Sequence, residues 1–303
     1  MYAIVNGKII MPDKVLENKV LVFNKQIVEI SDEVPANHEV IDARGNYVAP
    51  GLIDVHVHGS CGADTMDQSV EAIQTISEGI VKNGVTSFLP TTMTMSPEDI
   101  YGALKVVREC MSKEFDGAKV MGAHMEGPFI NAIYKGAQPE QYIVKPSYKF
   151  IEDYTDVIKL VSYAPEMDDD YSFTKEVKDK TDITLSIGHT NATYDQAMEA
   201  IDYGVSHVTH LFNAMTPLNH REPGVVGAAL TSDCYCEMIA DKIHINKSLF
   251  QFVLDNKGKH KVVLITDSMR AGCMKDGKYD LGGQDVYVKD GAARLESGSL
   301  AGS

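Results

Sequence analysis

The sequence predicts an α/β protein, a (β/α)8 TIM-like barrel preceded by a small N-terminal β domain. From Pro50 onward predicted strands alternate with predicted helices, and eight such strands lie between Leu52 and Asp267. Alternation of this kind is typical of a parallel sheet with helical crossovers, and eight repeats close a barrel. Size agrees, because 303 residues with 44% hydrophobic content suffice for a barrel and a small companion domain.

Residues 1–49 are expected to form the small β domain. Five short apolar runs, separated by Asn, Asp, Gly and Pro, occupy residues 2–5, 8–10, 20–23, 27–30 and 39–42. Asn6-Gly7, between the first two runs, is a turn signal typical of hairpins. No residue in this part has the pattern of a catalytic group.

Residues 50–303 are expected to form the barrel. Its strands are predicted near residues 55, 87, 122, 160, 185, 208, 238 and 264. Helices are predicted between them at residues 69–82, 96–111, 171–180, 193–203 and 247–256. The second helix has a clear start, because Ser96 is a good N-cap and a proline and two acids follow it.

The last part of the chain departs from the barrel pattern. A covering helix is expected after the eighth strand, but no amphipathic segment follows Asp267. Residues 285–296 instead predict a hairpin with an Asp290-Gly291 turn. We therefore expect that the final helix is missing and that the sequence ending at Ser303 is truncated.

Composition excludes several classes of partner. A formal net charge of −15 should repel nucleic acid and anionic membranes, so neither is expected as a partner. No apolar run is long enough to span a bilayer, and the first ten residues do not resemble a signal peptide. The five cysteines are odd in number and scattered, which favours a reduced, cytoplasmic compartment over a disulfide framework.

Potential metal ligands recur where the predicted barrel strands end. They are His56, His58, Glu126, His189, His210 and Asp267. The first two histidines are two residues apart in one strand, so their imidazoles point to the same side. Strand ends converge on one face of a barrel, where several strands supply catalytic residues. A single histidine would more often be structural, but the joint pattern favours a metal site.

His124 precedes Glu126 by two residues and can share its face of the strand. It is either a residue that orients the site or a packing residue, and the sequence does not distinguish the two.

Four segments resemble known enzymes. Pro50–Gly59 resembles the signature of the amidohydrolase superfamily. His124–Phe129, Gly188–Ala192 and Thr209–Met215 resemble one member family, the N-acetylglucosamine-6-phosphate deacetylases, and the order of motifs matches over nearly the whole chain. The resemblance implies hydrolysis of the acetamide of N-acetylglucosamine-6-phosphate to glucosamine-6-phosphate and acetate, a step of amino-sugar catabolism.

The resemblance also implies a divalent metal, one or two ions per subunit. It assigns the main ion to Glu126, His189 and His210, and a second ion to His56 and His58. Zinc is the first expectation, with iron, manganese, cobalt and nickel as the other metals that suit these ligands.

The reacting groups follow from the same resemblance. Asp267 is the implied general base, which takes the proton of the attacking water and passes it to the leaving nitrogen. His244 is implied to polarise the acetyl carbonyl or to bind the sugar.

Further residues are implied to bind the substrate. The backbone N–H groups of Asn213 and Ala214 and the Arg221 guanidinium are the expected phosphate ligands. In the resembled family this arginine acts across a subunit interface, so a homodimer is expected. Ala137 is implied as another substrate contact, but its neighbour Gln138 stands where the family has histidine, which leaves that contact in doubt. The family's chains also continue into a final helix and further β strands.

Two other functions stay open. A cyclic amidase of the dihydroorotase or hydantoinase kind would need a lysine at the end of the fourth strand, where this chain has Tyr163-Ala164-Pro165-Glu166. Such an enzyme would also lack the segment His210–Met215. An inactive barrel kept as an interaction surface would be expected to lose ligands, and here every ligand position is filled.

Overall fold

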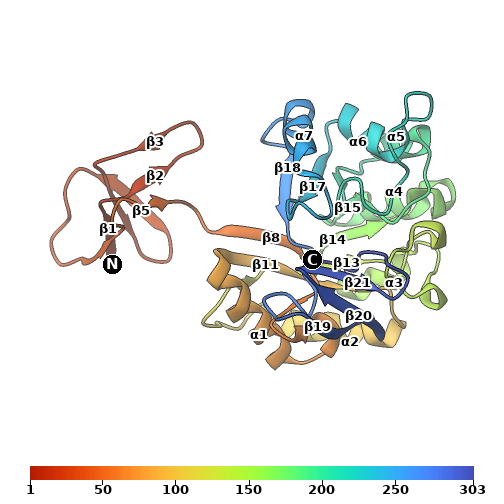
Figure 1. The fold of residues 1–303 in the computed structure, drawn as a ribbon, viewed down its shortest axis with the longest axis horizontal. Helices are drawn as coiled ribbons and strands as arrows, with labels where there is room; N and C mark the ends of the chain where they lie inside the picture. Colours follow the sequence, from red (N-terminus) through yellow and green to blue (C-terminus); the bar gives the residue numbers. More distant parts are fainter. The chain divides into compact units, whose positions relative to one another are not determined.

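The computed structural model describes residues 1–303, which divide into two compact units, Met1–Leu52 and Ile53–Ser303 (Figure 1). The first unit contains a four-stranded sheet of order β5-β4-β1-β6 and a three-stranded sheet of order β3-β2-β7. Its strands are β1 Tyr2–Val5, β2 Lys8–Ile10, β3 Val15–Leu16, β4 Val20–Phe23, β5 Ile27–Ser31, β6 Glu39–Asp42 and β7 Tyr47–Val48. All five strands predicted here are present.

The second unit is a (β/α)8 barrel, as predicted. Its parallel strands follow the order β8-β11-β13-β14-β15-β16-β17-β18. They are β8 Leu52–Val57, β11 Val85–Thr92, β13 Ala123–Glu126, β14 Ile158–Tyr163, β15 Thr184–Ile187, β16 His207–Val208, β17 Tyr235–Ile239 and β18 Val262–Ile265. Val57 pairs in parallel with Ser268, just after β18, and this bridge closes the ring.

Helices connect the barrel strands. They are α1 Val70–Ile80, α2 Pro97–Cys110, α3 Tyr148–Ile151, α4 Ser172–Lys180, α5 Tyr194–Asp202, α6 Gly224–Thr231 and α7 Phe250–Lys257. The five predicted helices are confirmed, and side-chain caps explain the starts of α1, α2 and α5. Ser96 accepts a hydrogen bond from the Asp99 N–H, and Thr193 forms a capping box with Gln196.

The sequence analysis missed two helices, the one-turn α3 and the longer α6. Gly224–Thr231 is almost uniformly apolar, and its residues from Gly224 to Ala229 are all buried. A helix that is apolar on every side shows no period of 3.6 residues, so the periodicity used for the other helices was absent.

Short elements complete the unit. The 3-10 turns are Thr65–Asp67, Val81–Asn83, Ala132–Tyr134, Glu140–Tyr142, Glu152–Tyr154, Pro165–Met167, Asp169–Tyr171 and Lys247–Leu249. The short strands are β9 Gly59–Ser60, β10 Ala63–Asp64 and β12 Lys119–Val120. None of the helices is both long and apolar enough to cross a membrane.

After β18 the chain forms a three-stranded antiparallel sheet. Its strands are β19 Gly277–Leu281, β20 Gln284–Lys289 and β21 Ala292–Leu295. The last two strands are the predicted hairpin, and Asp290 and Gly291 at its turn both have positive φ. Leu281 and Val286 pack with Met93 in a second apolar cluster, which fastens this sheet to the segment after β11.

Candidate metal centre

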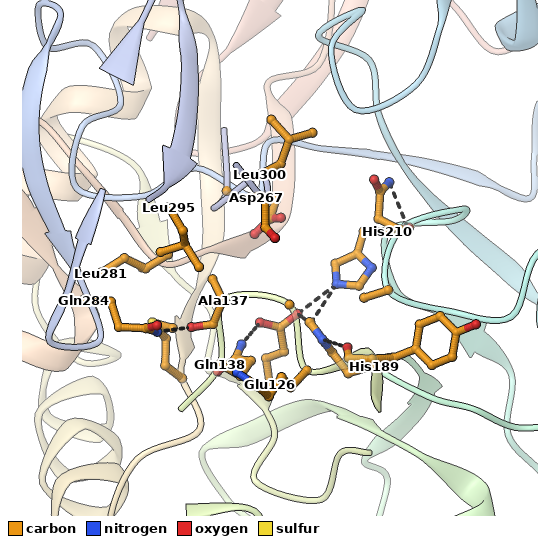
Figure 2. Close-up of a pocket in the computed structure, with 18 of the residues that line it drawn as sticks. Glu126, Ala137, Gln138, His189, His210, Asp267, Leu281, Gln284, Leu295 and Leu300 are labelled. Carbon is orange, nitrogen blue, oxygen red and sulfur yellow. Dashed lines mark hydrogen bonds and ion pairs between the residues drawn. The ribbon is translucent and has the colours of Figure 1, made fainter. Parts of the chain in front are cut away.

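The barrel brings the predicted ligands to one end of its strands. His56 lies in β8 and Glu126 ends β13, while three ligands follow their strands by two residues: His189, His210 and Asp267. Those three have left-handed backbone φ values of 48°, 29° and 51°. Such a conformation costs a non-glycine residue roughly 1–3 kcal/mol and recurs at functional sites. The turn directs the side chains into a common cavity (Figure 2).

Three ligands form a tight group. Glu126 Oε1 lies 3.1 Å from Nε2 of His189 and 3.1 Å from Nε2 of His210, and these two nitrogens are 3.1 Å apart. Two atoms bound to one tetrahedral ion at about 2.0–2.1 Å lie about 3.3 Å from each other. The three side chains are buried and their spacing fits a shared divalent cation.

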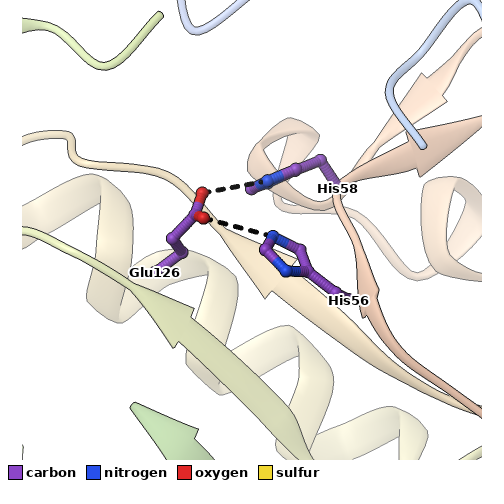
Figure 3. Close-up of side chains that lie close together, drawn as sticks. All are labelled: His56, His58 and Glu126. Atoms are coloured by element: carbon purple, nitrogen blue, oxygen red, sulfur yellow. Dashed lines mark ion pairs between the residues drawn. The ribbon is translucent and has the colours of Figure 1, made fainter. Parts of the chain in front are cut away.

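The histidine pair of β8 meets the same carboxylate. His58 Nε2 lies 3.1 Å from Glu126 Oε2, and His56 Nε2 lies 3.2 Å from Glu126 Oε1 (Figure 3). Asp267 Oδ1 lies 3.3 Å from His56 Nε2 and 3.4 Å from His58 Nε2. His56 Nε2 is buried without a hydrogen bond, as expected for an atom that faces a cation. Glu126 therefore stands between two groups of ligands.

The buried carboxylates and imidazoles of the site shift one another's pKa values. Burial disfavours protonation of His58, but the Asp267 and Glu126 carboxylates outweigh burial and raise its pKa to about 9. Burial would likewise raise the pKa of Glu126, yet the neighbouring imidazoles of His56 and His189 hold it well below its usual value. These anions attract positive charge, which a bound metal would supply in place of protons.

Other groups hold the Nδ1 atoms of two candidate ligand histidines, His56 and His189. Glu237 Oε2 accepts a hydrogen bond from His56 Nδ1 at 3.0 Å and another from the His210 backbone N–H at 2.9 Å. His189 Nδ1 donates to the Tyr134 carbonyl at 2.9 Å. Burial would raise the pKa of Glu237, but the His56 imidazole outweighs it and lowers that pKa to about 2. The sequence analysis missed Glu237, although an acid inside the apolar strand β17 was a usable signal.

His124 does not reach the candidate ions. Its Nδ1 lies 3.0 Å from the Val55 carbonyl and its Nε2 lies 2.7 Å from Ser162 Oγ. Burial, aided by the nearby His56, lowers the pKa of His124 to about 3, so the ring is neutral. Of the two readings left open, the orienting one is favoured, because His124 links β14 across the barrel to the Val55 carbonyl of β8, just before His56.

Gln138, whose role the sequence left in doubt, contacts a ligand directly. Its Nε2 donates to Glu126 Oε2 at 2.7 Å, and its Oε1 accepts the Thr94 backbone N–H at 2.8 Å. The amide is buried, so both of its ends are held and the rotation of the Glu126 carboxylate is restricted.

A cavity of about 720 Å³ opens above the metal centre. The predicted substrate residues that line it are Ala137, Asn213, Ala214 and His244. Three leucines line it as well, and they come from the C-terminal segment that sequence reasoning did not connect with the site: Leu281, Leu295 and Leu300 (Figure 2). Gln284 of β20 donates to the Ala137 carbonyl and so joins that segment to the loop beneath it.

Two predicted phosphate ligands differ from expectation. The Asn213 backbone N–H already donates to the His210 carbonyl at 2.9 Å, so this N–H is not free for a phosphate. Arg221 is exposed and lines a separate cavity of about 560 Å³ beside Asn219 and Thr216. Within one chain, therefore, Arg221 is not part of the cavity above the metal centre.

Known proteins resemble this chain in sequence and in fold. A model described as the amidohydrolase family matches residues 47–295. The N-acetylglucosamine-6-phosphate deacetylase of Bacillus subtilis is 40% identical over 97% of this chain and 77% of its own length. The crystal structure of that enzyme from Pasteurella multocida superposes with a TM-score of 0.92 at 35% identity, covering 99% of this chain and 80% of that one. A mutant Mycobacterium smegmatis deacetylase in complex with N-acetyl-D-glucosamine-6-phosphate superposes with a TM-score of 0.88 at 27% identity, covering 100% of this chain and 80% of that one.

Proposed function

The chain belongs to the amidohydrolase family, and from this premise we propose that it hydrolyses the acetamide of N-acetylglucosamine-6-phosphate. The products are glucosamine-6-phosphate and acetate. One observation carries the proposal: ligands and an acid from separate strands converge beneath one cavity in a chain 40% identical to an enzyme of that name. The cyclic amidase and the inactive scaffold are not favoured, because the similar enzymes in sequence and in fold are N-acetylglucosamine-6-phosphate deacetylases.

The metal centre would hold two divalent ions, with zinc as the first expectation. Glu126, His189 and His210 would hold one, and His56 and His58 would hold the other with Glu126 between them. A bound ion lowers the pKa of water from 15.7 to roughly 7 and polarises a carbonyl oxygen.

Buried charge supports two ions rather than one. Glu126, Glu237 and Asp267 are three buried carboxylates around the same group of imidazoles. Buried charges need compensation, and two dications offset these anions more fully than one does.

Asp267 serves as the general base. Burial would raise the pKa of Asp267, but the adjacent His56 and His58 imidazoles outweigh it and lower the pKa, so the carboxylate is ionised. It therefore takes the proton of the attacking water and then gives it to the leaving nitrogen, because an amine leaves readily only after protonation.

The cavity wall orients the substrate. His244 Nδ1 donates to Asp241 Oδ2 at 2.7 Å, which leaves its Nε2 to face the acetyl carbonyl or a sugar hydroxyl. The Ala214 backbone N–H is the remaining main-chain donor proposed for the phosphate, with the Asn213 and Ala137 positions beside it.

Phosphate binding also supports a homodimer. A phosphate pairs well with a guanidinium, yet Arg221 lies outside the cavity of its own chain. Arg221 from a second copy would supply that charge. We place the enzyme in the cytoplasm, which its five unpaired cysteines support.

An acetate-release assay tests the function. Purified protein is expected to release acetate from N-acetylglucosamine-6-phosphate, to act poorly on unphosphorylated N-acetylglucosamine and to leave dihydroorotate unopened. Asp267→Asn should lower kcat by roughly 10²–10⁴-fold, because general acid–base catalysis contributes about that much. Wild-type kcat in Asp267→Asn would refute the assigned base, and ring opening without acetate release would refute the reaction.

A further inference from the structure

Glu237 is a fully buried carboxylate to which the proposed reaction assigns no role. It lies in β17, whose neighbours Cys236 and Met238 are also buried. A buried anion is strongly unfavourable unless it is paired, so its partners indicate why it is there.

One oxygen of Glu237 contacts both groups of metal ligands. Its Oε2 accepts from His56 Nδ1 at 3.0 Å and from the His210 backbone N–H at 2.9 Å. Its Oε1 makes no hydrogen bond, and the His207 Nδ1 atom lies 3.9 Å from it. The strongest contacts of this carboxylate are therefore with one ligand of each proposed ion.

The contact with His56 determines where the hydrogen on that ring lies. An ionised carboxylate only accepts hydrogen bonds, so His56 Nδ1 must carry the hydrogen. Its Nε2 atom lies 3.2 Å from Glu126 Oε1 and 3.3 Å from Asp267 Oδ1, so Nε2 is the ring atom left to bind a cation. A lone pair surrounded by two carboxylate oxygens suits a cation, and a carboxylate behind a ligand histidine makes the ring more basic.

The other polar groups inside the barrel do not supply this charge. Ser162 and Ser186 both lie 2.6 Å from Thr209 Oγ1, and Ser186 lies 2.9 Å from His207 Nδ1. This chain of neutral groups ends at His124, whose two nitrogens are already engaged. His56, His124 and Glu237 lie close enough to suggest a further metal site, but those engaged nitrogens exclude one.

We propose that Glu237 is a positioning residue, which holds His56 as an Nε2 ligand and supplies the negative charge that secures the second divalent ion. The inference rests on the proposed metal centre but not on the identity of the substrate. The inference predicts different effects on the binding of the two ions. His56 contacts Glu237 through its side chain, whereas His210 does so only through its backbone.

The test is metal binding by protein stripped with a chelator. Cobalt(II) is titrated into each variant while visible absorption and metal per chain are measured. Wild type should bind two equivalents. Glu237→Gln keeps the size and one acceptor but removes the charge, so the second equivalent should bind at least about tenfold more weakly while the first changes little.

A matched control distinguishes charge from general disruption. Ser186→Ala breaks the same buried polar layer without a hydrogen bond to Glu237, and it should keep both equivalents at wild-type affinity. If Glu237→Gln binds each of the two equivalents as tightly as wild type does, the proposal is overturned. A wild-type chain that binds no cobalt would instead refute the metal centre itself.

A measurement on the unaltered protein covers the case in which Glu237→Gln does not fold. In zinc-loaded wild type, ¹⁵N-histidine NMR should show His56 with hydrogen on Nδ1 and none on Nε2. His56 with hydrogen on Nε2 would contradict the proposal without any variant.

Discussion

At the residue scale, Gln138 holds the carboxylate that joins the two groups of metal ligands. Gln138→Leu removes the donor to Glu126 Oε2 and leaves the buried Thr94 N–H without its acceptor. An unsatisfied buried group costs roughly 1–3 kcal/mol, so the free energy of unfolding of metal-free protein should fall by about that amount in urea titrations.

Gln284→Leu is the control variant for Gln138→Leu in the urea titrations. Gln284 contacts the same loop, through the Ala137 carbonyl, but does not touch Glu126. An unchanged urea midpoint in Gln138→Leu would show that these hydrogen bonds do not stabilise the fold. Sequence reasoning could only note Gln138 as unusual, because its partners lie 12 and 44 positions away in the chain.

The cysteines should differ strongly in reactivity. Cys273 is exposed, whereas burial raises the pKa of Cys236 to about 12 and that of Cys110 to about 11. Only the thiolate reacts, and at pH 8 a thiol of pKa 12 is ionised in about one molecule in ten thousand. A disulfide reagent should therefore label Cys273 first, and Cys110 and Cys236 should react far more slowly.

The variant Cys273→Ser should lose the fast labelling phase. Because the thiolate fraction rises with pH up to the pKa, the slow labelling of Cys236 should accelerate through pH 9 and 10. A fast phase that persists when the partly buried Cys61 is also replaced by serine would contradict the burial of Cys110, Cys234 and Cys236.

At the scale of elements, two helix glycines should respond oppositely to alanine. A Cβ at Gly227 of α6 would lie 2.4 Å from the Pro223 Cβ, which the pyrrolidine ring holds in place. A Cβ at Gly102 of α2 would instead meet the end of the flexible Gln68 side chain. Gly227→Ala should destabilise the protein by about 1–3 kcal/mol through overpacking. Gly102→Ala should be neutral or stabilise by up to about 1 kcal/mol, the helix preference of alanine.

Thermal unfolding of both variants and wild type checks this pair. A rise in Tm for Gly227→Ala would mean that the Pro223 ring, at the start of α6, can shift to make room for the added methyl group. The comparison also tests the packing of α6, an eight-residue helix that the sequence did not predict.

Elements with a local signal could be predicted from the sequence, and elements without one could not. Ser96 and Thr193 indicated helix starts because capping depends on neighbouring residues. The apolar helix α6 offered no periodicity. The ligands at strand ends were predictable, but the left-handed turns that aim His189 and Asp267, and the pairing of Glu237 with His56, depend on contacts between distant strands.

At the scale of the whole molecule, the candidate metal centre lies in a strongly acidic protein. The formal net charge is −15, and the buried carboxylates under the cavity need nearby positive charge to offset theirs. The barrel brings candidate ligands from separate strands to one site, where a divalent metal would offset these carboxylates. Activity should accordingly depend on bound metal rather than on the barrel alone.

Acetate release measured together with metal content tests this claim most directly. Protein stripped of metal by a chelator is titrated with zinc, and the rate with N-acetylglucosamine-6-phosphate is followed alongside metal bound per chain. We expect no release from stripped protein and a rate that rises with bound zinc up to the second equivalent. A full rate in metal-free protein, or no release with both equivalents bound, would contradict the account.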